Sequence, residues 1–271
     1  MKNRFGLLAP LILLWSLFGM SAFADEVDLR PQMTVVKSQG NRGTCSSFAA
    51  TALMEFLVSQ NEGVNLDLSE AFTYYLGKTK ALDTPYVKKI YSKGEALAGY
   101  LAVRAFMFGC MVESEWPYKS ENYRNSFIGK PPKGAKQLPY RIEPILIKPE
   151  NIAKFILSVK KPVVYNLLWC QSAVDNRTGK YRLPSEAELK DPAGHVILLV
   201  GYNSETREFI FRNCWGPDWG DHGYGTIPED YVLKYGEVSQ FKPFEQHPDD
   251  VREFLETASM GISGSLDEYG F

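Results

Sequence analysis

The chain has few histidines and few cysteines for its length: three His and four Cys in 271 residues. So few cysteines exclude a fold that is held together by a disulfide framework. Neither sign of charge dominates, because 30 Lys and Arg face 32 Asp and Glu. With that balance and no dense run of Lys and Arg, the surface offers little attraction for phosphates, and we expect no nucleic-acid partner.

Spacings typical of metal sites are also missing, since the sequence has no Cys-x-x-Cys and no His-Glu-x-x-His. We therefore expect no metal and no other cofactor. Hydrophobic residues make up 45% of the chain and charged residues 23%. This is ordinary globular usage and argues against intrinsic disorder.

Residues 1–24 have the pattern of a secretory signal. Lys2 and Arg4 give a positive start, residues 7–18 are apolar, and a small-x-small site ends at Ala24. The apolar run is short for a membrane span and is interrupted by proline and glycine. We predict cleavage after residue 24, export to the periplasm or the medium, and no stable membrane insertion after cleavage.

The first half of the remaining chain has helical patterns. Thr44 is a good N-cap for a helix that runs to about residue 60. Four of its apolar residues recur at helical spacing: Cys45, Phe48, Ala52 and Phe56. A second helix is expected from the capping-box-like run at 67–70 through Leu76, ended by Gly77, and a third helix over 97–108.

The second half has the patterns of strands. Residues 119–150 are rich in proline and predict a loop-rich connection, and residues 25–43 predict extended chain with a short strand candidate at 35–36. Strand-like runs follow at 162–169, 195–202, 208–215 and 223–227. A helical half followed by a strand-rich half predicts an α+β fold with two subdomains and a cleft between them.

We place one domain at residues 25–240. Its helical part covers about 44–118 and its β part about 119–240, with 25–43 crossing between them. Residues 241–271 form an acidic C-terminal tail in which an apolar stripe follows helical spacing: Val251, Phe254, Leu255 and Ala258. A helix this short is not stable alone, so we expect the stripe to dock on the folded body or on a partner.

Cys45 is the candidate nucleophile. It follows a glycine-containing turn and begins a predicted helix. The unpaired N–H groups and the dipole at a helix N-terminus favour the thiolate over the thiol. A buried structural cysteine is an equal alternative from position alone.

A thiolate nucleophile needs a base, and only three histidines can supply it. His195 opens an apolar strand and can face a cleft, whereas His222 lies in an exposed turn and His247 in the acidic tail. The strand period places Asn213 and Trp215 on one face. The oxygen of Asn213 can accept the second imidazole N–H, and Trp215 can shield that bond from water.

Four blocks occur in the order typical of one enzyme family. They are the runs 39–45, 68–70, 194–195 and 213–220. Together they resemble the papain family of cysteine peptidases, and the similarity extends from about residue 28 to 235. The resemblance implies a papain-like fold with a helical left subdomain and a β-barrel-like right subdomain around the cleft. It also implies a secreted, bacterial thiol protease that cleaves peptide or protein substrates.

The resemblance assigns roles to individual residues. It implies that Cys45 is the nucleophile, His195 the acid and base, and Asn213 the residue that orients the imidazole. Gln39 would donate to the oxyanion together with the backbone N–H of Cys45. The supporting residues would be Trp215 and Gly194.

Three positions depart from the family pattern. Arg42 stands where the family often has a disulfide-forming cysteine, Ser46 where it often has Trp or Tyr, and Cys214 where Ser is common. The three cysteines other than Cys45 are at 110, 170 and 214, so at most one pair can form among them.

The alternative from another class is a non-catalytic papain-fold binding protein or effector scaffold. Such a scaffold has no need of the full polar set, yet all four members are present: Gln39, Cys45, His195 and Asn213. A cell-wall amidase is disfavoured, because its histidine follows the nucleophile closely and here no histidine lies between Cys45 and His195.

Overall fold

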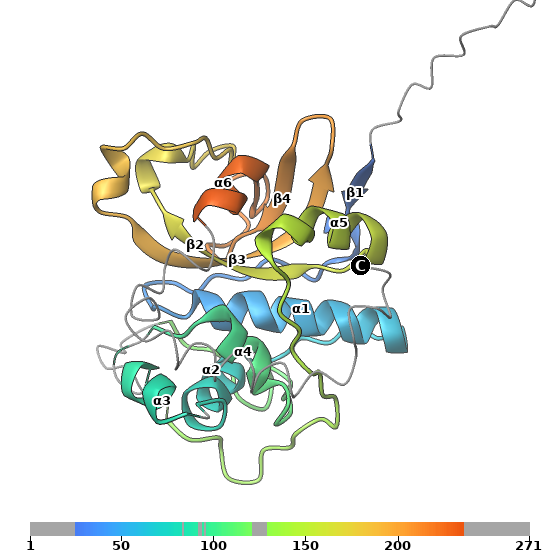
Figure 1. The fold of residues 1–271 in the computed structure, drawn as a ribbon. Helices are drawn as coiled ribbons and strands as arrows, with labels where there is room; N and C mark the ends of the chain where they lie inside the picture. The colour runs from blue at the N-terminus through green and yellow to red at the C-terminus, as the bar shows by residue number, and fades with distance from the viewer. Residues whose placement is uncertain (1–24, 83, 92–93, 95, 121–128, 236–271) are drawn as a thin grey trace, which may run out of the picture.

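The computed structural model describes residues 25–82, 84–91, 94, 96–120 and 129–235. The predicted signal at 1–24 and the whole acidic tail at 241–271, with His247, lie outside the described residues. A long helix, α1 (Cys45–Glu62), runs through the middle of the molecule, with further helices on one side and a sheet on the other (Figure 1).

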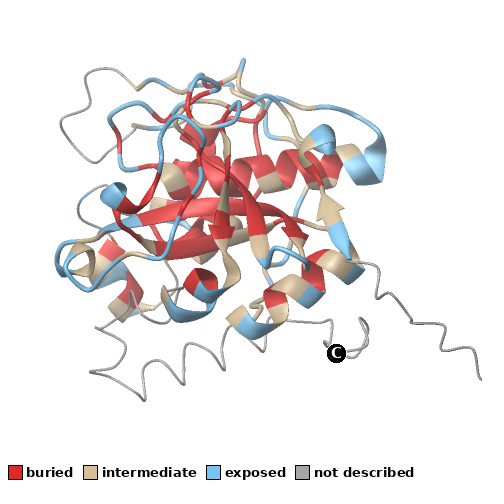
Figure 2. Ribbon diagram, turned by 90° about the horizontal axis from the view of Figure 1, so that it is seen from above, coloured by how far each residue is buried: buried red, intermediate tan, exposed pale blue. Residues whose placement is uncertain are grey.

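The helical subdomain contains α1, α2 (Glu70–Thr79), α3 (Pro85–Tyr91) and α4 (Gly99–Ala105). Every residue from 46 to 52 in α1 is buried, so this part of the helix is enclosed on all sides (Figure 2). One side of α1 packs against α2 and α4 in an apolar cluster that includes Met54, Leu101 and Phe106. The opposite side packs against the sheet.

Two helix boundaries differ from the sequence prediction. Gly77 does not end α2 but lies inside it, and the missing side chain makes room for Leu97, whose methyl group would lie 2.5 Å from a Cβ at this position. The predicted helix 97–108 is shorter, as α4 begins only at Gly99. Its N–H donates to Asn166 Oδ1 at 2.8 Å, and the preceding Ala98 is extended. In both cases a tertiary contact overrides the local pattern.

The β subdomain is a curled antiparallel sheet of five strands: β1 (Glu26–Asp28), β2 (Val163–Trp169), β3 (Ala193–Asn203), β4 (Glu208–Arg212) and β5 (Tyr224–Pro228). The long β3 is central. It pairs with β2 and β1 along successive stretches and with β4, through a bulge between Leu199 and Gly201. The four predicted strand runs are confirmed within a few residues, and so is the α+β class.

Helix α1 covers one face of the sheet, and α5 (Pro149–Val159) and α6 (Glu229–Tyr235) cover the other (Figure 1). Short 3₁₀ turns lie at Arg30–Gln32, Gln171–Ala173 and Glu188–Lys190. The sequence analysis missed α5, whose Pro149 stands in the first turn and whose buried Ile152, Phe155 and Ile156 follow helical spacing. The expected strand at 35–36 is wrong: Val35 is 80% exposed, and the first strand is β1.

Residues 25–43 touch both subdomains. β1 joins the sheet, and Ser38 pairs with Trp215 in an isolated β-bridge. The Gln39 N–H donates to Cys214 O at 2.8 Å. These contacts of the crossing segment place Gln39 near the start of α1.

All four cysteines are free thiols, so the one disulfide that the sequence allowed is not formed. In the described part of the chain, no helix has the length and apolar character that crossing a membrane requires. No group of three or more His, Cys, Asp or Glu side chains there could hold a metal ion.

Candidate active site

Cys45 is the first residue of α1, and its side chain is partly exposed. Its thiol receives hydrogen bonds from the backbone N–H groups of Val196, of Ser46 and of Cys45 itself. The helix N-terminus therefore points at the sulfur, and the strand that carries His195 meets it from the other side of the cleft. Thr44 is the N-cap as predicted, but its side chain does not cap the helix.

His195 lies on β3 and is 6% exposed. Its Nε2 is 2.9 Å from Asn213 Oδ1, and the same oxygen accepts the Cys214 N–H at 2.9 Å. Because the backbone N–H fixes which amide atom is the oxygen, Nε2 of His195 must be the nitrogen that carries the proton. Nδ1 is then the unprotonated nitrogen and can act as a base.

Two tryptophans enclose the imidazole. The ring of Trp215 lies 5.0 Å from that of His195, and the ring of Trp169 lies 4.8 Å from it. Trp215 was expected from the sequence, whereas Trp169, at the end of β2, was not. Gly194 is exposed, and a Cβ there would meet nothing within 4 Å, so the chain leaves open space beside the buried ring.

Burial dominates the titration of both groups. It raises the pKa of the Cys45 thiol to about 11, against the three N–H groups that favour the thiolate. It lowers the pKa of His195 to about 4, although the bond to Asn213 acts in the opposite direction. For Cys45 taken alone, desolvation outweighs the helix N-terminus, whereas an acidic thiol that rests on the helix N-terminus together with His195 as imidazolium stays a prediction.

No hydrogen bond joins Cys45 to the His195 ring within the described residues. Transfer of the thiol proton to His195 would nevertheless create two opposite charges and no net charge. A net charge in a buried site is costly, whereas a compensated pair is much less so. The arrangement thus favours reaction of the two residues as a pair over ionisation of either one alone.

Gln39 lies beside the cleft but its amide is already engaged. Nε2 donates to the Arg42 carbonyl, and Oε1 accepts from the Cys214 thiol at 2.6 Å. An amide nitrogen has two hydrogens, so one N–H remains for another acceptor. These contacts hold the side chain rigidly and also brace the turn before Cys45.

Tyr118 is a site residue that the sequence analysis missed. Its hydroxyl donates to Gln39 O at 2.9 Å and therefore accepts from Thr44 Oγ1, at 2.7 Å. Its ring packs edge-on against Phe48, 4.8 Å away. A single side chain thus ties the loop that carries Gln39 to the first turn of α1. The only available signal was its place after Trp116 and Pro117.

Arg42 takes the place where the family often has a disulfide-forming cysteine. The side chain is 3% exposed, and its guanidinium carbon lies 5.7 Å from the ring centre of Tyr74 and 5.9 Å from that of Tyr118. Cation–π contacts of this kind strengthen when water is excluded. They link the turn to α2 and to the segment that carries Tyr118.

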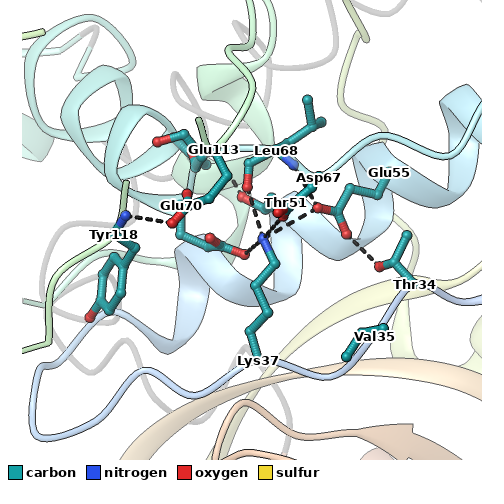
Figure 3. A network of polar contacts seen from close by, with 12 residues as sticks. Thr34, Val35, Lys37, Thr51, Glu55, Asp67, Leu68, Glu70, Glu113 and Tyr118 are labelled. Carbon is teal, nitrogen blue, oxygen red and sulfur yellow. Dashed lines mark hydrogen bonds and ion pairs between the residues drawn. The ribbon is translucent and has the colours of Figure 1, made fainter. Parts of the chain in front are cut away.

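Lys37 joins the segment before Cys45 to α1 and α2 through ion pairs, as Figure 3 shows. Its Nζ lies 2.6 Å from Asp67, 2.8 Å from Glu70 and 3.5 Å from Glu55. Attraction by these carboxylates outweighs burial and raises the pKa of Lys37. Burial raises the pKa of Glu70 to about 8, with Lys37 opposing and the nearby Glu55 adding to the shift.

His222 is not part of this site. Its side chain is 91% exposed in a turn, as expected. The described structure therefore brings together Cys45, His195, Asn213 and Gln39, with Trp215 and Gly194 beside the histidine.

A family model described as papain family cysteine protease matches residues 23–240. The chain belongs to this family.

Three relatives illustrate the similarity, at 25–26% identity. A viral cathepsin of Antheraea pernyi nuclear polyhedrosis virus is 26% identical over 73% of this chain and 56% of its own length. An uncharacterized peptidase C1-like protein of Acanthamoeba polyphaga mimivirus is 26% identical over 78% of this chain and 70% of its own. Pro-cathepsin H of Mus musculus is 25% identical over 77% of this chain and 61% of its own length. The chain thus spans little more than half the length of the viral cathepsin.

Two solved structures share the fold. Xylellain, a cysteine protease from Xylella fastidiosa, superposes with a TM-score of 0.65 at 22% identity, over 79% of this chain and 83% of its own. The Carica candamarcensis cysteine protease CMS1MS2, solved with E-64, gives a TM-score of 0.55 at 19% identity, over 79% and 97%. They support the papain-like architecture.

Proposed function

We propose that this protein is a peptidase that cleaves peptide bonds through a thioester on Cys45. The observation that carries the proposal is the bond between His195 Nε2 and Asn213 Oδ1 at 2.9 Å, on an oxygen that the Cys214 N–H fixes. This bond leaves Nδ1 of His195 as a base of defined orientation. The next residue of the same strand, Val196, donates its backbone N–H to the Cys45 thiol.

The first half of the reaction forms the thioester. His195 Nδ1 takes the thiol proton as the Cys45 sulfur attacks the carbonyl carbon of the scissile bond. The carbonyl oxygen becomes an oxyanion, which the backbone N–H of Cys45 and the remaining N–H of Gln39 can stabilise. Collapse of this intermediate breaks the C–N bond, and the imidazolium gives its proton to the leaving amine.

The second half restores the enzyme. His195 now takes a proton from water, whose oxygen attacks the thioester carbon. The C–S bond breaks, the acid product leaves, and the sulfur recovers its proton from His195. Asn213 holds the ring in one orientation for both proton transfers, and Trp169 and Trp215 limit access of water to the bond that holds it.

Digestion of a peptide library by the full chain tests the proposal. We expect cleavage by the wild type and none by Cys45→Ala, which keeps the fold but has no nucleophile. An epoxide such as E-64 should add covalently to Cys45, detected by peptide mass spectrometry. A different result would contradict the proposal: the wild type cleaves no peptide and does not react with the epoxide, and wild type and Cys45→Ala bind peptides equally well. The protein would then be a papain-fold binding protein.

We further propose that the protein is exported and processed after Ala24. The positive start, apolar run and small-x-small site of residues 1–24 support this. Sequencing of the N-terminus of protein recovered from the periplasm or the medium should begin at Asp25. Recovery only from the cytosol, with Met1 retained, would contradict export.

A further inference from the structure

An apolar groove lies at the end of α1 opposite Cys45. It encloses a cavity of about 340 Å³. Leu53 and Leu57 of α1, Val103 of α4 and Val163 of β2 line it, together with the extended segment 142–147. Leu57 follows Cys45 by twelve residues, which corresponds to roughly 18 Å along a helix. The groove is therefore separate from the cleft that holds the reactive thiol.

The lining of the groove is apolar but incompletely covered. These four side chains are only partly buried, and Ile145 in the crossing segment is 39% exposed. Nearer its N-terminus α1 is enclosed, because every residue from 46 to 52 is buried. A contiguous open apolar surface of this kind marks a place where another segment binds.

The described chain ends in α6, which contacts a residue of the groove lining. Tyr165, which lines the groove, donates its hydroxyl hydrogen to the carbonyl of Val232 in α6. Tyr235, the last described residue, packs against the same apolar cluster as Ile152 and Phe155, which also line the groove. Residues 236–271 continue from this point.

The sequence beyond Tyr235 contains a segment of matching chemistry. Val251, Phe254, Leu255 and Ala258 repeat at the spacing of one helix face. Residues 236–250 precede this stripe and, at about 3.3 Å per residue, reach far beyond the groove. A tether of this length keeps the stripe at a high effective concentration near the groove, so modest contacts suffice for docking.

Charge supports the same pairing. Lys161 lines the groove, and α5, whose Ile152 and Phe155 also line it, carries Lys148, Lys154 and Lys160 at or between its ends, with Glu150 as its one acid. The stripe is flanked by acids at 249, 250, 253 and 256, and Arg252 is the one Lys or Arg between residues 245 and 271. Glu143 is the one acid that lines the groove.

We propose that residues 251–258 bind as a short helix in this groove of their own chain, with Phe254 and Leu255 inserted between α1 and segment 142–147. The groove is then the surface of the folded body on which the stripe of the acidic tail docks. The proposal does not depend on the peptidase activity, because the groove and the cleft use opposite ends of α1.

Hydrogen exchange of the full chain tests the docking. Phe254→Asp with Leu255→Asp should speed amide exchange in segment 142–147 and in the last turns of α1 by roughly tenfold. Ile145→Asp should have the same effect from the groove side. Leu183→Asp, at an apolar residue that is 47% exposed outside the groove, is the matched control and should change exchange in neither segment.

Cross-linking gives a second measurement that does not depend on a destabilising variant. A photoreactive benzoylphenylalanine at position 254 should form links to groove residues within one chain, identified with mixed light and heavy protein. Links between two chains, links spread over the surface, or exchange rates that the tail variant leaves unchanged would each overturn the proposal. Peptide hydrolysis in the same samples reports on the cleft separately.

Discussion

His195 is held by its own sheet, whereas the start of α1 at Cys45 is held by the segment that precedes it, through contacts with α2 and with Tyr118. The ring is fixed by Asn213, which follows the strand adjacent to β3, and by Trp169 of β2 and Trp215. The thiol stands at the end of a helix whose position depends on Gln39, Arg42, Lys37 and Tyr118. The position of His195 is therefore set by the register of the strands, whereas the position of Cys45 depends on several individual side-chain contacts.

The difference predicts where the molecule tolerates change. Sheet register is specified by many pairs, so one substitution beside His195 has a local effect. On the cysteine side one hydroxyl or one guanidinium joins whole segments, and removing it affects the fold and the position of Gln39 together.

The largest effect is expected from His195→Ala. Loss of the base should reduce kcat by roughly 10³–10⁴-fold. The thiol, left without a proton acceptor and still largely shielded from water, should titrate near its raised pKa of about 11. Iodoacetamide alkylation followed from pH 5 to pH 10 checks this. An alkylation profile identical to that of the wild type would show that Cys45 and His195 do not act as a pair.

Gln39→Ala should reduce kcat by roughly 10²–10³-fold and leave KM nearly unchanged, the usual result of losing one oxyanion donor. Alkylation of Cys45 should stay near normal because the histidine is untouched. Cys214→Ser, which keeps a donor for Gln39 Oε1, is the matched control and should retain activity. If Gln39 only braces the turn, the Ala variant will lose thermal stability and alkylation rate together.

Tyr118→Phe removes the hydroxyl that joins Gln39 to Thr44. We expect a loss of about 1–3 kcal/mol in the free energy of unfolding, because two partly buried polar groups lose their partner. The kcat should fall several-fold as well. Tyr181→Phe is the control from the β subdomain: its hydroxyl accepts the Cys170 N–H at 2.6 Å, so it should cost stability but not kcat. Equal kcat losses in both variants would contradict a special role for Tyr118.

The smallest effect concerns pH and Glu70. Its pKa is raised to about 8 in the folded protein, so between about pH 4.5 and 8 the folded state keeps a proton that the unfolded state has lost. Over this window the contribution of Glu70 to stability falls as the pH rises, by up to about 1.4 kcal/mol per pH unit.

Glu70→Gln should remove this slope while keeping an acceptor for Lys37. Thermal unfolding of both proteins across the window measures the difference between the two slopes. Glu62→Gln, at an exposed acid of α1, should leave the profile as it is. Parallel profiles for wild type and Glu70→Gln would mean that Glu70 is ionised throughout.

The sequence predicted those parts of the molecule that local chemistry determines. α1, the four main strands and the grouping of Cys45, His195 and Asn213 follow from caps, periodicity and motif order. α5 was missed because the prolines around it suggested a loop, and Gly77 was misinterpreted because its neighbour Leu97 is distant in the sequence. Trp169 has no local signal, and Tyr118 has only its place after Trp116 and Pro117, since their roles exist only through contacts made on folding.

The thiol pKa shows the same limit. A helix N-terminus can be inferred from the residues before Cys45, but the extent to which the sheet and α1 exclude water from the sulfur cannot. Desolvation, which exceeds the effect of the three N–H groups, depends on the closed fold.

Arg42 has a further consequence for how the protein responds to oxidants. Its contacts with two tyrosines join the turn to α2 and to the segment of Tyr118 without a covalent bond, and none of the four cysteines is paired. Reductants therefore have no disulfide to break, so they should not change the stability of the fold. Three thiols are buried, and Cys45 alone is partly exposed. Peroxide should consequently convert Cys45 to a sulfenic acid first, so that inactivation precedes any loss of structure and a mild thiol reverses it.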